Sequence, residues 1–143
     1  GKPVQLTWSR WQEHVAGWPR PPAAAVLAAK LGEGGIVTGW KTRIAVPPAG
    51  LEFGRRLFSG MTPRAAIAAS AGEVDRLAME GAVPPYAVPD MIVEHVPVSI
   101  DLPAGRLRGN AHGYTAFFTE SFVDELARKA GREPLSFRIA MLG

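Results

Sequence analysis

The chain has 143 residues, of which 47% are hydrophobic and 20% are charged, a balance typical of a globular protein. It contains no cysteine, which excludes disulfides, thiolate nucleophiles and cysteine-ligated metal sites within these residues. The 16 basic and 13 acidic side chains give a net charge of +3 without any block of five basic residues, so we expect no nucleic-acid surface. No apolar run approaches the ~20 residues of a membrane-spanning helix, so we expect no membrane span.

The first third of the chain is predicted to form strands. Residues 2–10 alternate apolar and polar side chains, which predicts a strand. Residues 11–22 are rich in proline and tryptophan and are expected to be an irregular connection. The segments 24–31 and 36–46 flank a glycine-rich turn, and the second is rich in β-branched residues. We therefore predict a hairpin, although alanine and leucine in the first segment favour a helix locally.

The middle of the chain is expected to contain a long excursion, two helices and a strand. Residues 47–61 contain several prolines and glycines and are interpreted as a long loop. Thr62 and the proline after it predict a helix that ends near residue 71, followed by a short helix over residues 73–79. Residues 91–101 alternate with the period of a strand, and the proline within them favours an edge position or a bulge.

The order of these elements shows no regular alternation of strands and helices. Pro134 is predicted to begin a last helix. We therefore expect an α+β fold with a mainly antiparallel sheet and helices packed on it, formed by residues 1–143 as a single domain.

The loop at residues 103–113 is the chain's best candidate for a binding site. It contains three glycines, and a helical pattern follows from Tyr114 to a stop near Gly131. A glycine-rich loop that leads into a helix lets backbone N–H groups approach an anionic ligand. The spacing matches neither a P-loop nor a dinucleotide-binding loop, and a loop that only connects strand to helix remains the alternative.

Other catalytic or metal-binding patterns are absent from the sequence. His14, His95 and His112 are far apart and have no partner at metal-ligand spacing. Asp124 and Glu125 are adjacent on a predicted helix, where they cannot face each other as a pair. Anion or cofactor contact at the loop is therefore the chemistry that remains.

The residues from Arg106 to Leu142 also form a recognisable pattern. An arginine–glycine loop is followed by a helix and a last helical segment that contain Glu120, Ser121, Phe122, Asp124, Glu125, Leu126, Ala127, Ala130, Gly131, Pro134, Phe137 and Arg138. This pattern resembles the molybdenum-cofactor-binding subunit of the xanthine dehydrogenase and aldehyde oxidase family, in particular the isoquinoline 1-oxidoreductase β-subunit type. The likeness is looser upstream, over residues 1–10 and 84–90.

The resemblance implies a molybdopterin cofactor, in the cytosine dinucleotide form, and hydroxylation of an aldehyde or N-heterocycle. It implies that the backbone amide of Arg108 approaches the molybdenum centre, with Leu107 and Gly109 beside it in the cofactor-binding loop. Asn110 falls where the family often has an aromatic residue that lines the substrate pocket, which makes it the candidate substrate contact.

The resemblance also implies that this chain is an internal part of a larger subunit. The family's catalytic glutamate and pterin-contacting loop have no counterpart here, so we expect no catalytic residue in the chain and no turnover by the chain alone. The expected partners are the remainder of the same subunit and an iron–sulfur subunit or domain. The compartment stays open between bacterial cytoplasm and periplasm.

Two other functions remain compatible with the sequence. The chain could be a structural or interaction domain whose loop meets no cofactor. It could also be an anion-binding module that uses Arg55, Arg56, Arg106 and Arg108 and binds in a salt-dependent way. An excised domain would expose apolar patches that neighbours normally cover, so we expect self-association.

Overall fold

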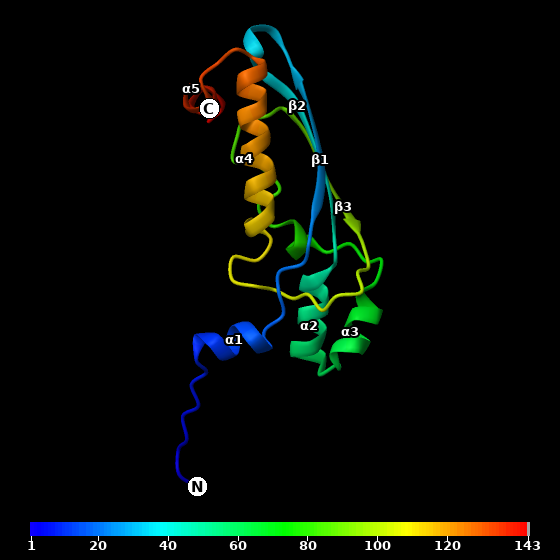
Figure 1. Cartoon of the computed structure of the whole chain (residues 1–143). Coiled ribbons are helices and arrows are strands. Elements are labelled where there is room, and N and C mark those ends of the chain that lie inside the picture. The colour runs from blue at the N-terminus through cyan, green and yellow to red at the C-terminus, as the bar shows by residue number, and fades with distance from the viewer. Residues whose placement is uncertain (143) are drawn as a thin grey trace.

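The computed structural model describes residues 1–142 and shows an α+β fold (Figure 1), which confirms the predicted class. In chain order the elements are α1 (Arg10–Ala16), β1 (Ala24–Leu31), the 3-10 turn η1 (Glu33–Gly35), β2 (Val37–Val46), α2 (Ala49–Ser59), α3 (Pro63–Ser70), the 3-10 turn η2 (Arg76–Met79), β3 (Asp90–Pro97), α4 (His112–Lys129) and α5 (Pro134–Met141).

The sheet has three strands in the order β1-β2-β3. β1 and β2 form the predicted antiparallel hairpin, with Ala24 opposite Ala45 and a register shift near Lys30. β2 and β3 are parallel, with Val46 opposite Pro97 at their shared end. A parallel pair needs a long crossover, which α2, α3 and η2 supply. Pro97 closes its strand at an edge of the sheet, as its missing N–H requires.

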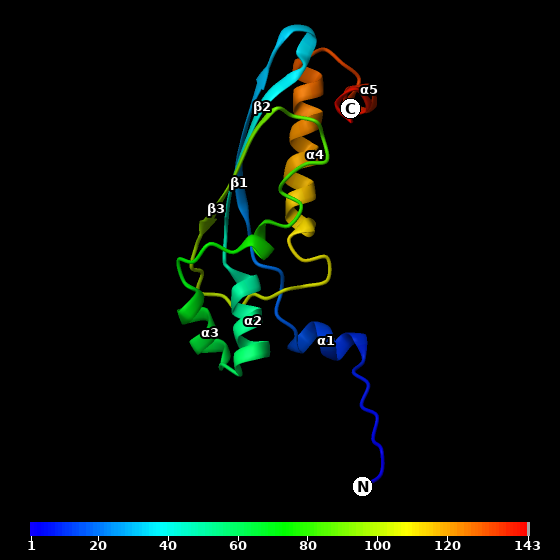
Figure 2. The same cartoon turned by 180° about the vertical axis from the view of Figure 1, so that it is seen from behind.

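Helix α4 lies along one face of the sheet, while α1, α2 and α3 gather at the end away from the hairpin tip (Figures 1 and 2). The side chains of β1 alternate strictly between exposed and half-buried, so its other face is open to solvent. At the hairpin tip Gly35 has φ 74, and a Cβ added there would lie 2.7 Å from Cβ of Ala130. Glycine therefore allows the tip to touch the end of α4.

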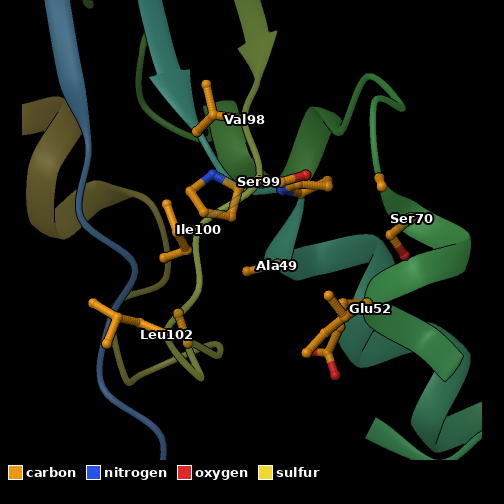
Figure 3. Close-up of a pocket in the computed structure, with 12 residues that line it drawn as sticks. Ala49, Glu52, Ser70, Val98, Ser99, Ile100 and Leu102 are labelled. Atoms are coloured by element: carbon orange, nitrogen blue, oxygen red, sulfur yellow. The ribbon is translucent and has the colours of Figure 1, made fainter. Parts of the chain in front are cut away.

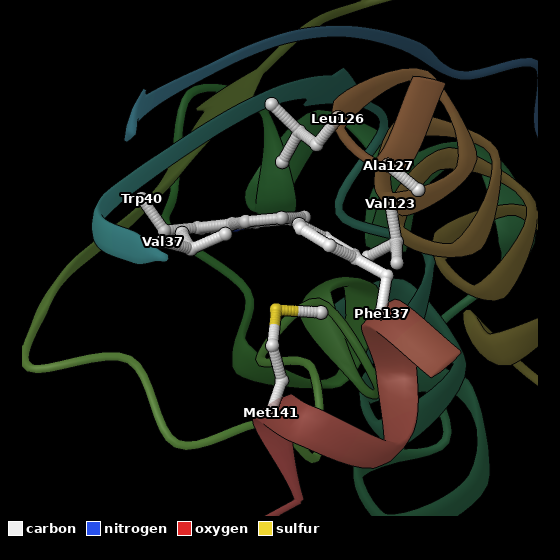
Figure 4. Close-up of a cluster of buried hydrophobic side chains, with 7 residues drawn as sticks. All are labelled: Val37, Trp40, Val123, Leu126, Ala127, Phe137 and Met141. Carbon is white, nitrogen blue, oxygen red and sulfur yellow. The ribbon is translucent and has the colours of Figure 1, made fainter. Parts of the chain in front are cut away.

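The main core lies between β2, α4 and α5 (Figure 4). Trp40 of β2 meets Phe122 edge-to-face with 5.1 Å between the ring centroids. The indole N–H of Trp40 donates to the hydroxyl of Thr42 at 2.6 Å, so the buried polar group has a partner. The buried members of this cluster are Val37, Trp40, Val123, Leu126, Ala127, Phe137 and Met141.

The predicted strand over residues 2–10 is wrong. Residues 1–9 are extended but pair with no strand of the described chain, and α1 begins at Arg10. Ser9 and Gln12 cap that helix reciprocally through side chain and backbone, a local signal that sets the helix start. A strand needs a neighbouring strand to pair with, and alternation of side chains alone does not supply one. The irregular connection predicted for residues 11–22 is also wrong over α1.

The long loop predicted for residues 47–61 is likewise wrong, because α2 occupies most of it. The carboxylate of Asp75 accepts hydrogen bonds from the N–H groups of Gly50 and Leu51, at 2.7 and 3.1 Å. This buried side chain supplies the N-terminal cap from 25 residues away, where local sequence cannot reveal it. The short helix predicted over residues 73–79 is reduced to the 3-10 turn η2.

Candidate functional site

The candidate loop contains a tight corner at residues 107–110, immediately before α4. The N–H of Asn110 donates to the carbonyl of Leu107 at 2.8 Å, which closes a four-residue turn. Gly109, the third residue, has φ 86, the positive value that a type II turn requires at this place. Asn110 follows with φ 46, a left-handed conformation that asparagine tolerates better than most residues.

Arg20 holds this corner from the side of the hollow that lies beneath it. Its guanidinium donates to the carbonyls of Arg108 at 2.7 Å and Asn110 at 3.2 Å. A Cβ added at Gly113 would lie 2.3 Å from Cζ of Arg20, so only glycine leaves room for the guanidinium against the start of α4. One charged side chain therefore fixes two carbonyl groups of the corner at once.

Arg106 supports the corner from the other side. Its Nε donates to Oδ1 of Asn110 at 3.0 Å, and its terminal nitrogen pairs with the carboxylate of Glu80 at 3.2 Å. Both side chains of this ion pair are mostly buried, so the pair is less screened than one on the surface. The side-chain oxygen of Asn110, the candidate substrate contact, therefore already accepts a hydrogen bond from another residue of the loop.

These contacts direct the N–H groups of Arg108 and Gly109 outward. In a trans peptide the N–H points opposite to the carbonyl of the preceding residue. The carbonyls of Leu107 and Arg108 face Asn110 and Arg20, so the following N–H groups face away from them. Within residues 1–142 neither N–H has a hydrogen-bond acceptor, and both residues are exposed. The corner thus presents two adjacent donors to solvent.

Beneath the corner lies a hollow of about 260 Å³ whose lining includes Arg20, Arg106, Leu107 and Tyr114. The hydroxyl of Tyr114 donates to the carbonyl of Ala78 at 2.6 Å. Burial, reinforced by the nearby carboxylate of Asp75, raises the pKa of Tyr114 to about 12. This tyrosine therefore stays neutral over the physiological range and acts as a fixed hydrogen-bond donor.

A larger hollow of about 410 Å³ lies between α2, α3 and the segment that follows β3 (Figure 3). Its walls are mainly apolar. The buried carboxylate of Glu52 forms an ion pair with Arg56 one helical turn away, and the hydroxyl of Ser70 accepts a hydrogen bond from Arg55. Two of the polar side chains at this hollow, Glu52 and Ser70, are therefore already paired with arginines of α2.

The helical residues of the recognised pattern form a separate cluster between α4 and α5. Arg138 donates to Glu120 at 2.9 Å and to Asp124 at 2.6 Å, and the hydroxyl of Tyr86 donates to Glu120 at 2.9 Å. Burial and the Glu120 carboxylate raise the pKa of Tyr86. Desolvation opposes the charge of Arg138, but its hydrogen bonds to Asp124 and Glu120 prevail and raise its pKa. These residues join two helices.

The three histidines lie apart in the fold. His95 accepts a hydrogen bond from the N–H of Asp75 at Nδ1, at 3.0 Å, and its Nε2 lies 2.9 Å from the carbonyl of Val46. A backbone N–H can only donate, so Nδ1 of this ring is the acceptor and Nε2 carries the proton. Within the described chain no three histidine or acidic side chains form a group that could hold a metal ion.

The structure places Leu107, Arg108, Gly109 and Asn110 together at one exposed corner, with Leu107 48% exposed. The sequence analysis missed the residues that hold this corner, which are Arg20 and Glu80. Arg20 lies in a proline-rich stretch 90 residues before Asn110, and no local pattern connects the two. The only sign of Arg20 in the sequence near the corner is Gly113, because a larger residue there would collide with the guanidinium of Arg20.

No helix within residues 1–142 is both long and apolar enough to cross a bilayer. A scan against protein-family models and a search of curated protein sequences found no match to this chain.

Proposed function

We propose that this chain is a domain of the large, cofactor-binding subunit of a molybdenum hydroxylase, and that its contribution to the site is the corner Leu107–Asn110. The observation that carries the proposal is the outward N–H of Arg108, which has no acceptor within residues 1–142 although its neighbours' carbonyls are fixed. The resemblance over Arg106–Leu142 assigns this same amide to the molybdenum centre.

The chemistry of the corner suits an anionic, oxygen-rich group such as molybdopterin cytosine dinucleotide. The N–H groups of Arg108 and Gly109 are adjacent donors, and the Arg108 side chain adds a positive charge beside them. When bound, the cofactor supplies the two-electron oxidation of an aldehyde or N-heterocycle. A preorganised backbone N–H would stabilise negative charge that develops on a nearby oxygen and would do so without titrating.

The corner alone is a small part of such a site. It offers two backbone donors and one cation, and a cofactor of this size needs many more contacts. We expect the remainder of the subunit to supply the general base and the pterin contacts, and an iron–sulfur subunit or domain to accept electrons. The isolated chain should hold far less than one equivalent of molybdenum and should not oxidise an aldehyde.

A pair of substitutions at position 108 separates the backbone donor from the side chain. Arg108→Ala removes the guanidinium and keeps the N–H. Arg108→Pro removes both, and the second position of a type II turn accommodates proline without distortion. In the complete subunit that contains this chain, we expect Arg108→Pro to lower kcat about 10²-fold or more relative to Arg108→Ala, as the loss of an oxyanion-type donor does.

Molybdenum content and circular dichroism of both variants are the controls, because they show whether the subunit still folds and loads. Equal kcat for the two loaded variants would contradict the proposed role of the amide. One equivalent of molybdenum on the isolated chain would contradict the view that other segments hold the cofactor.

A second candidate, an interaction domain, is favoured by the N-terminal arm. Val4, Leu6 and Trp8 are 91%, 73% and 61% exposed, and Trp11 of α1 is 76% exposed. Apolar side chains in such a row are typical of segments that dock on a partner. The sequence that follows this chain in its gene separates the two functions, because a downstream glycine–glutamate motif supports the hydroxylase.

The geometry gives less support to a basic anion-binding module. Arg55 is paired with Glu73 at 2.9 Å, and Arg56 and Arg106 are paired with Glu52 and Glu80. Of the four arginines considered, only Arg108 keeps its guanidinium without a carboxylate partner within residues 1–142.

A further inference from the structure

β1 has a free edge, because it pairs with β2 alone. The strand order places β1 at one edge of the sheet, paired only with β2. Alternate residues of such a strand point their N–H and C=O groups away from the sheet, and within residues 1–142 no other backbone group pairs with them. In Figure 1 β1 runs along the sheet with no other segment in front of it.

The other edge strand, β3, is protected in ways that β1 is not. β3 carries Asp90 and Glu94 and ends at Pro97, and charges and prolines are the usual means of preventing strand addition. β1 reads AAVLAAKL, with Lys30 as its one charged residue and no proline. A long apolar edge of this kind is expected to pair with another strand.

We propose that β1 pairs antiparallel with β1 of a second copy of this chain, which joins the two sheets into one six-stranded sheet about a two-fold axis. An isologous contact of this kind closes on itself and stops at the dimer. The inference concerns the chain alone and does not depend on the proposed molybdenum function.

The residue pattern of β1 is complementary to itself. Directly opposed residues of an antiparallel pair lie on the same face, so the two-fold axis passes beside one residue and not between two. The residues at the middle of β1 are Leu27 and Ala28. An axis beside Leu27 places Lys30 opposite Ala24 of the second copy, and an axis beside Ala28 places it opposite Val26, so the two Lys30 side chains are never opposed. No like charges are therefore opposed across the contact.

The face of β1 toward α4 also favours this pairing. Leu27, Ala29 and Leu31 are half-buried and pack against the core cluster. Antiparallel pairing about the axis places the same row of the second copy directly beside them. The contact would bury the exposed flanks of these side chains and continue the apolar layer from one copy into the other.

Lysines placed on the exposed face of β1 test the contact. Val26 is 72% exposed and Ala28 is also exposed, so Val26→Lys/Ala28→Lys leaves the core intact. The new lysines lie opposite Arg43 and Lys41 of β2, so circular dichroism must show that the variant is folded before its association is measured. In either register the variant sets lysines of the two copies opposite each other. Sedimentation equilibrium should show a reversible dimer for the parent chain and a dissociation constant raised at least about tenfold for the variant, from several like-charge pairs.

The matched control adds the same charge elsewhere. Ile92 on β3 and Phe117 on α4 are 54% and 68% exposed, and Ile92→Lys/Phe117→Lys should leave the dimer intact. A parent chain that stays monomeric at about millimolar concentration would overturn the proposal, since a contact between two short edge strands is expected to be weak but detectable at that concentration. A dimer that the β1 lysines do not weaken, or that the control lysines weaken equally, would overturn it as well.

Because the chain has no cysteine, single cysteines report the register. Directly opposed Cβ atoms lie close enough for a disulfide, so either Ala28→Cys or Leu27→Cys should form a covalent dimer on oxidation. Ile92→Cys, on the opposite edge, should stay monomeric under the same oxidant. Cross-linking of Ile92→Cys with neither β1 variant reacting would place the contact at β3 and contradict the proposal.

Discussion

The stretch from Arg106 to Leu142 contains two regions of opposite character. At the α4–α5 junction, Phe137 is buried and Arg138 is bonded to both Glu120 and Asp124. At the corner of residues 107–110, the side chain of Arg108 and two N–H groups face solvent while the carbonyls are held from behind. Side chains converge on each other in the first region, and backbone donors are presented outward in the second.

This difference divides the residues of the recognised pattern into those that packing explains and those that are free to contact a ligand. Glu120, Asp124, Phe137 and Arg138 need no cofactor to account for their presence, because each contacts another member of the pattern or the core. The side chain of Arg108 and the N–H groups of Arg108 and Gly109 have no comparable contacts within the described chain, and the fold needs Gly109 only for the turn. A functional role for the stretch therefore depends on the corner and not on the helices.

The largest effect should come from the core side of the junction. Phe137 is 1% exposed, and Phe137→Ala should lower the free energy of unfolding by about 3–5 kcal/mol because it removes a buried ring and leaves a cavity. Urea unfolding followed by circular dichroism measures this loss. Phe117→Ala, at a 68% exposed position of α4, should lower stability by about 1 kcal/mol or less, because it loses only an edge-to-face contact with Phe118. Similar losses for the two would show that α5 is not part of the core.

The ion-pair cluster should contribute less, but measurably. Arg138→Gln and Glu120→Gln should each destabilise the fold, and their double-mutant cycle should give a coupling free energy of about 1 kcal/mol, since the two side chains are in direct contact. Arg128, exposed on the same helix, provides the control, because Arg128→Gln combined with Glu120→Gln should be additive. A cycle with no coupling between positions 120 and 138 would remove the structural explanation of the pattern.

An effect of about the same size is expected at the hollow beneath the corner. The pKa of Tyr114 is raised from 10.0 to about 12 in the folded chain, so the unfolded chain loses its proton first as the pH rises. The free energy of unfolding should therefore fall between pH 10 and about 12 and be unaffected below that window. Tyr114→Phe should cost about 1 kcal/mol at neutral pH through its lost hydrogen bond. It should also flatten the alkaline decline, whereas an unchanged slope would contradict the burial of this hydroxyl.

Sequence reasoning succeeded where the determinants are local. The glycine-rich turn and the β-branched run of residues 36–46 predicted the hairpin, and Thr62, Gly131 and Pro134 marked helix boundaries that the structure confirms to within a few residues. It failed at residues 2–10 and 47–61. Residues 2–10 do not form a strand because no other strand lies beside them. Residues 47–61 form a helix whose first turn is capped by Asp75, far away in the sequence.

The candidate site divides in the same way. Its glycines and arginines are close together in the chain, so the sequence alone locates the corner. The residues that orient it could not be, because Arg20 and Glu80 reach the corner only through tertiary folding. The role of the four corner residues in cofactor and substrate binding remains a proposal.

Amide hydrogen exchange at Arg108 and Asn110 tests the account most directly. The N–H of Asn110 is bonded to the carbonyl of Leu107, whereas the N–H of Arg108 has no acceptor in the described chain. NMR of the 15N-labelled chain should show Arg108 exchanging at close to the rate of an unstructured peptide and Asn110 exchanging more slowly. Strong protection of the Arg108 amide in the monomer would mean that the donor is already used within the fold, and the proposed molybdenum contact would then be wrong.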